Sequence, residues 1–365
     1  MTSASPSLRT EEGVETMTSD TSEWFGAAVL AWCDRHGRKD LPWQRDPTPY
    51  RVWVSEIMLQ QTRVETVIPY YLRFLRELPS VDHLARVSDE VLLKLWEGLG
   101  YYRRAANMKR AAGQLLAQHA GRLPGEVSEL LRLPGIGPYT AGAIASIAFG
   151  QPVPAADGNV LRILARLTGR RDCIDDAAVR KELTATLSSW IPSDRPGDFN
   201  QALMDLGATV CLPNGTPLCD KCPLQGFCRA HTEDLTEDIP QRSRKKPRKI
   251  QRKTVFVIAW KGKVALQKRQ KGGLLQSLWE FPGAEGWLSE GDCRGTLDSW
   301  GIQAGPIGAM GRTKHLFTHI EWHMEGFRTE AVCVAEPDRW TWVTAEEMSS
   351  VYPMPAALRF YSEQL

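Results

Sequence analysis

The 365-residue sequence predicts two folded domains, an all-α domain followed by an α+β domain. The prediction rests on apolar residues at helical spacing through residues 22–240, a change of composition at Gln241, and strand-like alternation after residue 254. Residues 1–21 are rich in Ser, Thr and Glu and lack an apolar core, which predicts a disordered tail. We therefore expect a helical domain at 22–240, a basic linker at 241–253 and an α+β domain at 254–365.

Helices are expected in the first domain where apolar residues recur every three or four positions between Pro and Gly residues. In the first of them, at 23–36, Trp24 and Trp32 lie on one face. The others are expected at 51–59, 64–75, 90–99, 105–117, 127–133, 139–149, 159–167 and 198–210. No strand-like alternation interrupts them, so this domain should be all-α.

In the second domain the apolar spacing changes to every second residue. Two such runs, at 255–260 and 264–266, flank a short Gly-containing turn and predict a β-hairpin. Residues 320–327 and 331–334 predict two further strands, and 345–348 a short helix. Together they predict an α+β fold.

The overall composition is that of a globular protein and does not identify a partner. Net charge is +2, with 42% apolar and 24% charged residues. The basic run at 242–253 is typical of a solvated tether and is also compatible with phosphate attraction. No apolar run is long enough to span a bilayer, and the first twenty residues do not resemble a signal peptide, so we expect a cytoplasmic protein.

Four of the eight cysteines fall within one short segment and predict a metal site. Their spacing is C-x7-C-x2-C-x5-C, and both tetrahedral zinc and iron–sulfur clusters use four thiolates. Spacing does not decide between the two. The four residues are Cys211, Cys219, Cys222 and Cys228.

A turn with two glycines, Gly135 and Gly137, separates two apolar helical segments. Glycine permits positive φ and close approach of a partner, and the first N–H groups of the following helix attract phosphate. A helix corner that needs glycine for close packing explains the same residues equally well.

Two carboxyl groups, those of Glu56 and Asp157, are candidates for catalysis. Glu56 lies within an apolar helical segment, either at its solvent edge or buried; burial would raise its pKa and suit a general acid. Asp157 precedes the helix expected at 159–167 and so is a candidate N-cap, which the helix dipole would keep ionised. A neutral and an anionic carboxyl are the pair that glycosidic cleavage uses.

Several motifs together resemble the helix–hairpin–helix DNA glycosylases, and among them the adenine glycosylases of the MutY type. The motifs are Leu41-Pro42-Trp43, Val54-Ser55-Glu56 through Arg63-Val64, the run 96–102, the hairpin 133–141, Asp157-Gly158-Asn159, Phe199-Asn200-Gln201-Ala202, and the four cysteines. The resemblance spans residues 24–365. It implies a six-helix barrel with an iron–sulfur subdomain, followed by a Nudix-like domain.

The resemblance also implies a reaction, in which adenine opposite 8-oxoguanine or guanine is flipped out of duplex DNA and removed. Glu56 would protonate N7 of the base, and Asp157 would stabilise the oxocarbenium sugar. Tyr139 and Asn159 would lie around that sugar. The adenine pocket would be lined by Leu41, Trp43, Val64 and Gln201.

In the family that the sequence resembles, the residue at position 139 determines whether the strand is cut as well as the base removed. Relatives that also cut the strand carry a Schiff-base lysine there, whereas Tyr139 cannot form an imine, so we expect little or no lyase activity. The resemblance implies that lesion DNA is contacted by Gln61, Thr62, Leu99, Tyr101, Gly135, Gly137, His315, Phe317, Thr318 and His319. Thr318 stands where the family has serine and keeps its hydroxyl.

The resemblance implies a [4Fe–4S] cluster rather than zinc, although seven residues instead of the family's six separate Cys211 from Cys219. It implies a monomer that binds duplex DNA in the bacterial nucleoid and leaves open a contact between the linker and a sliding clamp or another repair protein. The segment 283–287 contains one acidic residue, so the Nudix-like domain should read the lesion rather than hydrolyse a nucleotide.

Two other functions compete with this one. An endonuclease III-type glycosylase and lyase for oxidised pyrimidines would share most motifs, but Tyr139 and the second domain argue against it. A protein that only recognises damaged DNA would not need both Glu56 and Asp157.

Overall fold

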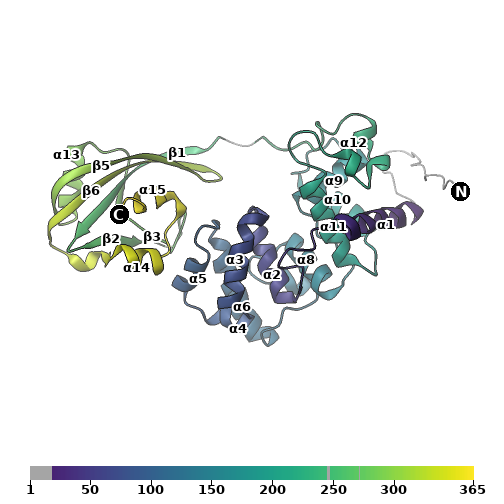
Figure 1. Ribbon diagram of the computed structural model, residues 1–365, viewed down its shortest axis with the longest axis horizontal. Helices are drawn as coiled ribbons and strands as arrows, with labels where there is room; N and C mark the ends of the chain where they lie inside the picture. The colour runs from purple at the N-terminus through teal and green to yellow at the C-terminus, as the bar shows by residue number, and fades with distance from the viewer. Residues whose placement is uncertain (1–18, 245–246, 271) are drawn as a thin grey trace. The chain divides into compact units, whose positions relative to one another are not determined.

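A computed structural model describes residues 19–244, 247–270 and 272–365. The chain divides into two compact units (Figure 1). One comprises the chain up to residue 85 together with residues 107–244, and the other comprises residues 86–106 and 245–365. Of the expected tail, residues 1–18 lie outside the described residues, and 19–21 are helical instead of disordered because helix α1 begins at Ser19.

The first unit is helical, as the apolar spacing predicts. Expected and observed helices agree to within a few residues at most ends, while α4, α10 and α12 were not expected. Their bounds are α1 Ser19–His36, α2 Pro49–Leu59, α3 Val64–Glu77, α4 Val81–Arg86, α6 Arg103–His119, α7 Val127–Leu130, α8 Pro138–Phe149, α9 Gly158–Thr168, α10 Ala177–Ser188, α11 Pro196–Thr209 and α12 Arg229–Thr232, with 3₁₀ turns η1 Cys219–Lys221 and η2 Gln225–Phe227.

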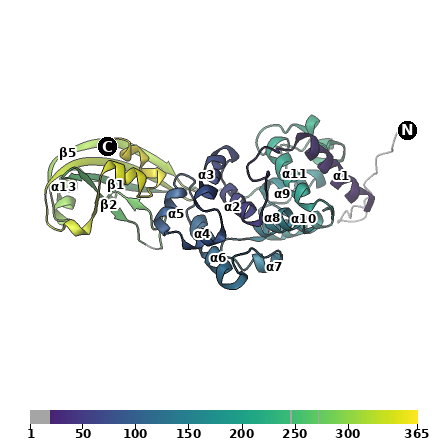
Figure 2. The same cartoon turned by 60° about the horizontal axis from the view of Figure 1, so that its bottom comes forward.

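A large apolar core joins α1, α9 and α11, which lie side by side in Figure 2. Phe25 of α1 is buried against the rings of Trp190 and Phe199, at centroid distances of 4.9 and 5.7 Å. Leu164 of α9 and Leu203 of α11 are fully buried in the same cluster. Burial of such side chains stabilises the fold by about 1.5–3 kcal/mol each. This core fixes the start of α9, where Asp157 lies.

The second unit contains one mixed β-sheet and four helices. Helix α5 spans Asp89–Leu95, four residues shorter than expected at its end, because Gly98 and Gly100 then adopt positive φ. The remaining elements are β1 Lys249–Trp260, β2 Lys263–Lys268, β3 Trp279–Glu280, β4 Gly283–Glu285, α13 Glu290–Ser299, β5 Ile302–Leu316, β6 Ile320–Val334, η3 Pro337–Arg339, β7 Thr341–Val343, α14 Ala345–Ser350, η4 Ala356–Leu358 and α15 Arg359–Ser362.

The strand order is β3-β2-β1-β6-β5, with β4 paired to β1 and β7 paired to β2. β1 and β6 are parallel, and the other pairs are antiparallel. Three expectations need correction here. β1 already begins at Lys249, inside the expected linker; residues 320–334 form one strand instead of two; and β5, rich in Gly and interrupted by register shifts, gave no alternating signal.

Helices cover both faces of this sheet. Phe256 and Ile258 of β1 are buried with Cys293 and Leu297 of α13. Val255 and Val257 point to the other face, where they are buried with Tyr361 of α15. In the described part of the chain, every helix is too short or too polar to cross a lipid bilayer.

Candidate active site

A cavity of about 740 Å³ opens in the first unit, at the carboxyl end of α2 and the start of α9. This volume lies within the ~300–1,000 Å³ common for small-molecule sites. Residues from α2, the loops on either side of it, the first turn of α8, the segment before α9, and α11 line the cavity. Among the lining residues are Leu41, Trp43, Glu56, Gln61, Thr62, Val64, Tyr139, Asp157, Asn159 and Gln201.

Glu56 is buried, with 5% of its surface exposed. Helix α2 buries nearly all its residues from Tyr50 to Met58, so a carboxyl in its middle cannot reach open solvent. Burial raises the pKa of Glu56 to about 7; the hydrogen bond from Tyr139 lowers it and the charge of Asp157 raises it. Both protonation states are therefore accessible near neutral pH, as a general acid requires.

Tyr139 lies in the first turn of α8 and donates a hydrogen bond from its hydroxyl to Oε2 of Glu56, at 2.6 Å. The turn before it needs glycine at Gly135, where φ is +83° and a Cβ would come within 2.8 Å of Asn107. Gly137, the N-cap of α8, has φ −98° and open space around its Cα. Within the chain, glycine is thus required at Gly135 alone of the two, and close approach of a partner to this turn stays a prediction.

Asp157 is the N-cap of α9, as expected. Its Oδ1 accepts hydrogen bonds from the backbone N–H groups of Asn159 and Val160 at 2.9 and 2.8 Å, and its Oδ2 accepts one from Nδ2 of Asn159 at 2.8 Å. Burial raises the pKa of Asp157, outweighing these bonds and the charge of Arg162, which lower it. Burial and the hydrogen bonds at the start of α9 therefore act in opposite directions on this pKa, and an ionised Asp157 stays a prediction.

Asn200 on α11 holds the segment that leads to Asp157, a role that the sequence did not reveal. It is fully buried; its Oδ1 accepts from the N–H of Ala155 at 3.0 Å, and its Nδ2 donates to Ser146 Oγ and to the carbonyl of Val153, each at 2.9 Å. Every polar atom of this amide is bonded. The available signal was its place in the Phe199-Asn200-Gln201-Ala202 motif.

The sequence also missed cavity residues from the loop before α2 and from α11. Arg38 binds Asp205 through Nε and Nη2 at 2.8 and 2.6 Å, and both line the cavity. Oε1 of Gln44, another lining residue, is buried without a hydrogen-bond partner in the described structure. These groups leave polar atoms on the cavity wall.

The expected lesion-recognition residues fall into both units. In the second unit, Tyr101 is 47% exposed at φ +49°, and its hydroxyl lies 3.2 Å from Oγ1 of Thr318. Leu99, in contrast, is buried, and its backbone N–H and carbonyl bond to Trp96 and Arg104.

The turn between β5 and β6 presents Thr318 and His319 to solvent. Phe317 anchors it by packing on His315 and Trp322, with centroid distances of 4.7 and 4.9 Å. The backbone N–H of Lys249 donates to the carbonyl of His319 at 3.0 Å, which ties the turn to β1. The turn is thus held at its base and exposed at its tip.

The four clustered cysteines lie beside the carboxyl end of α9. The pKa of Cys222 is raised to about 12, chiefly by burial and further by the neighbouring Cys211, Cys228 and Cys219. Nη1 of Arg166 lies 3.2 Å from Sγ of Cys211, and Nε of Arg162 donates to the carbonyl of Cys211 at 2.9 Å.

Four thiols in one short segment are a candidate donor set for a metal ion or for an iron–sulfur cluster. Among the described residues, no three His, Cys, Asp or Glu side chains form a donor set for one ion. Four thiolates on one zinc would lie roughly 3.8 Å apart. A polynuclear iron–sulfur cluster instead binds each thiolate through a different iron.

Replacing Tyr139 by phenylalanine removes the hydrogen bond that favours the Glu56 carboxylate, so the pKa of Glu56 should rise. A reaction that needs protonated Glu56 slows as pH rises through this pKa, and in the variant the decline should move to higher pH. Single-turnover rates measured on both sides of pH 7 check this. A decline at the same pH in both proteins would contradict the assignment of the acid.

Comparison with protein-family models finds two matches. Residues 54–189 match the HhH-GPD superfamily of base excision DNA repair proteins, and residues 254–364 match the NUDIX domain. The first match contains Glu56, Tyr139 and Asp157, and the second contains the β5–β6 turn.

Curated relatives cover most of the chain. The adenine DNA glycosylase of Homo sapiens is 34% identical over 390 residues, spanning 88% of this chain and 70% of the human protein. That of Buchnera aphidicola subsp. Baizongia pistaciae is 36% identical over 297 residues, spanning 81% of this chain and 83% of the Buchnera protein.

Solved structures resemble the helical part. A thermostable thymine-DNA glycosylase matches with a TM-score of 0.53 and 26% identity, over 59% of this chain and 98% of its own. An endonuclease III in a non-covalent complex with DNA matches with a TM-score of 0.51 and 24% identity, over 60% and 99%. The second likeness shows the fold only.

Proposed function

Because the chain belongs to the adenine DNA glycosylase family, we propose that it removes adenine paired with 8-oxoguanine, and with guanine, from duplex DNA. The observation that carries the proposal is the buried Glu56, with a pKa of about 7, facing the same cavity as Asp157 and bonded to Tyr139. A carboxyl that is neutral near pH 7 beside a second carboxyl matches the needs of glycosidic cleavage.

The glycosidic bond is inaccessible within stacked DNA, so the adenine must leave the helix and enter the cavity. There Glu56 gives its proton to N7 of adenine as the bond between C1′ and N9 breaks, and the electron pair of that bond leaves with the base. Tyr139, already bonded to Glu56, stabilises the carboxylate that remains. Leu41, Trp43, Val64 and Gln201 line the wall that the base meets.

Loss of the base leaves positive charge on the sugar, which Asp157 is placed to stabilise. All three hydrogen bonds to its carboxyl are donated by N–H groups, so they favour the carboxylate form. Water then adds at C1′ and releases a proton. The products are free adenine and an intact strand that carries an abasic site.

We propose that strand cleavage does not follow. An imine with the abasic sugar requires an amine, and the described residues that line the cavity include no lysine. Tyr139, at the position where strand-cutting relatives place that amine, offers a phenol.

We propose that Cys211, Cys219, Cys222 and Cys228 hold a [4Fe–4S] cluster. When bound, the cluster stabilises the loop that these cysteines span and supplies no step of base excision. The partly buried thiols and their mutual electrostatic influence support this donor set.

The change Cys222→Ser should abolish the cluster while the rest of the chain still folds around its other cores. We expect loss of iron and sulfide from the purified protein, loss of the broad visible absorption, and a lower unfolding temperature. Cys293→Ser, a buried cysteine of the second unit, serves as control and should keep the iron. Full iron content in the Cys222 variant would contradict the assignment.

We propose that the domain at 254–365 reads 8-oxoguanine through the β5–β6 turn and has no hydrolase activity. The acidic residue of the 283–287 segment, Glu285, is paired with Lys253 at 2.6 Å. Thr318, exposed at the tip, supplies a hydroxyl for the lesion.

Replacing Thr318 by alanine should reduce the preference for 8-oxoguanine over guanine opposite adenine by roughly 5- to 10-fold, the worth of one hydrogen bond. Affinity for the two duplexes, measured side by side, checks this, while single-turnover rates at saturating enzyme should change little. Equal losses on both duplexes would remove Thr318 from lesion recognition.

One panel of duplexes tests the proposed function. Adenine opposite 8-oxoguanine, adenine opposite guanine, and thymine glycol opposite adenine are scored for base release in single turnovers. We expect release from the first two, fastest from the first. Release from thymine glycol would favour the endonuclease III-type function, and binding without release would favour a recognition protein.

A further inference from the structure

The sheet face that carries α13 is uncovered at one end. Alternate residues of β1 point to this face. Phe256 and Ile258 are buried there with α13, and Arg252 and Ile250, nearer the start of the strand, point to the same face. Ile250 is 56% exposed, and Arg252 is exposed as well. The uncovered end is formed by β1, β6 and β5, and the Phe317–His319 turn connects the last two of these strands.

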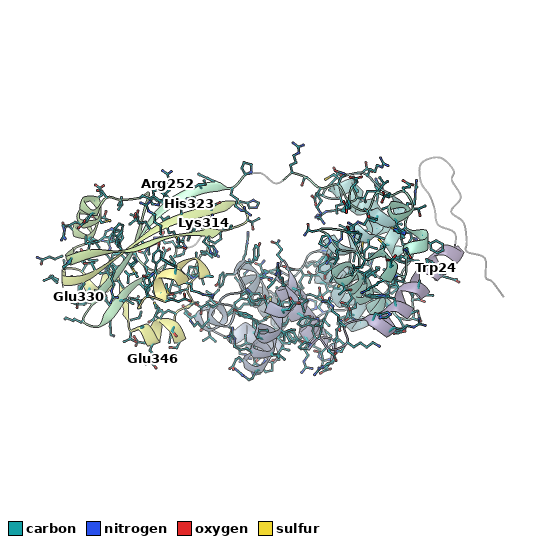
Figure 3. All side chains as sticks on the ribbon, turned by 45° about the horizontal axis from the view of Figure 1, so that its top comes forward. Trp24, Arg252, Lys314, His323, Glu330 and Glu346 are labelled. Carbon is teal, nitrogen blue, oxygen red and sulfur yellow. The ribbon has the colours of Figure 1, made fainter. Side chains whose placement is uncertain are left out.

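Three polar residues form one row across this end. Arg252 of β1 is in register with His323 of β6, and His323 is in register with Lys314 of β5. Figure 3 shows the three together on neighbouring strands, with Glu330 far away toward the other end of β6. With strands about 4.8 Å apart, the row is about 10 Å wide.

A tryptophan contacts one arginine of this row and a second arginine beside it. The guanidinium groups of Arg252 and Arg312 lie 4.8 and 4.5 Å from the ring centroid of Trp287, and Nε1 of Trp287 donates to the carbonyl of His323 at 3.3 Å. Stacking of this kind restricts the arginine side chains before any ligand arrives. We call Arg252, Trp287, Arg312, Lys314 and His323 the hairpin patch.

The acidic neighbours of the patch are already engaged. Glu325 pairs with Arg312 at 3.1 Å, and Glu321 is bonded to His323 at 2.7 Å. Among the described residues, neither Arg252 nor Lys314 takes part in an ion pair, and both are exposed. Two positive charges therefore face solvent at the two ends of the row, about 10 Å apart, which suits a partner with repeated negative charges.

We propose that the hairpin patch binds the phosphate backbone of the duplex whose lesion the adjoining turn reads, an inference that rests on the proposed function. Lys314 lies three residues before Phe317 along β5, about 10 Å away, so a duplex at the turn brings phosphates within reach. Ile250 and Leu316, exposed in the row nearer the turn, suit the apolar faces of the sugars. Such contacts position the protein without reading sequence.

The double variant Arg252→Gln, Lys314→Gln tests the proposal in the full-length protein. Its matched control is Lys263→Gln, Arg339→Gln, which removes the same charges elsewhere in the unit. Lys263 is paired across the sheet with Trp260, which lies eight residues and about 26 Å along β1 from Arg252. Arg339 stacks on Trp340 much as Arg252 stacks on Trp287. Affinity for an undamaged duplex and for the 8-oxoguanine duplex is measured over a series of salt concentrations.

If the patch binds two phosphates, the slope of log affinity against log salt should shrink by about 2, and affinity at low salt should fall on the order of 10- to 100-fold. The loss should be equal on both duplexes, and the saturated single-turnover rate should match the wild type. If the slope of log affinity against log salt is the same in the patch and control variants, the proposal is wrong. A patch that binds a protein instead would give that result. If the wild type fails to release adenine, the proposed function is wrong, and the salt slopes still test whether the patch binds phosphates.

Discussion

Replacing Glu56 by glutamine is expected to slow adenine release by roughly 10²- to 10⁴-fold, the usual contribution of a positioned general acid. The amide has the shape of the carboxylic acid but no proton to give. It can still accept the Tyr139 hydrogen bond, so the cavity should keep its form. Since the wild-type carboxyl is buried and has a pKa of about 7, the variant also loses its titration near neutral pH.

The measurement is single-turnover release of adenine from the 8-oxoguanine duplex, together with duplex affinity. We expect unchanged affinity and a flat, slow rate across pH. Glu77→Gln, at the exposed end of α3, is the control and should behave as the wild type. A Glu56 variant as fast as the wild type would mean that the proton comes from another group.

Replacing Asp157 by asparagine should slow the reaction by roughly 10²- to 10³-fold, because a negative charge beside the developing oxocarbenium ion is lost. Asparagine is as good an N-cap as aspartate, so the side-chain oxygen can still accept from the N–H groups of Asn159 and Val160. The change thus removes charge with little effect on the fold.

Asp176 offers a matched control for this variant. It is the N-cap of α10 and accepts from the N–H groups of Ala178 and Val179, but it does not line the cavity. We expect Asp176→Asn to leave both the rate and the unfolding temperature nearly unchanged. If both variants lose stability and rate alike, Asp157 acts through the helix cap and not through its charge.

Helices were predictable from the sequence because apolar spacing is a local property. The strands of the second unit were harder to predict. β6 shows clear alternation around Trp322 and Met324. β5 includes Gly305, Gly308 and Gly311, and it is a strand because it pairs with β6. Such long-range pairing leaves no local pattern.

The site was predictable in its residue types and not in its geometry. The sequence placed Glu56 and Asp157 on different segments, and only the packing of α2 against α8 and of α9 against α11 brings them to one cavity. Their pKa values follow from burial, which outweighs the N-terminus of α9 at Asp157. Asn200 was missed because its hydrogen bonds reach residues about fifty positions away.

The most direct test of the account is to identify the products of one turnover on the adenine:8-oxoguanine duplex, with wild-type protein and with Glu56→Gln. The wild type should release one free adenine per duplex and leave the strand whole until alkali is added, and the variant should release almost none. Strand breaks without alkali, or adenine release at the same rate from both proteins, would contradict it.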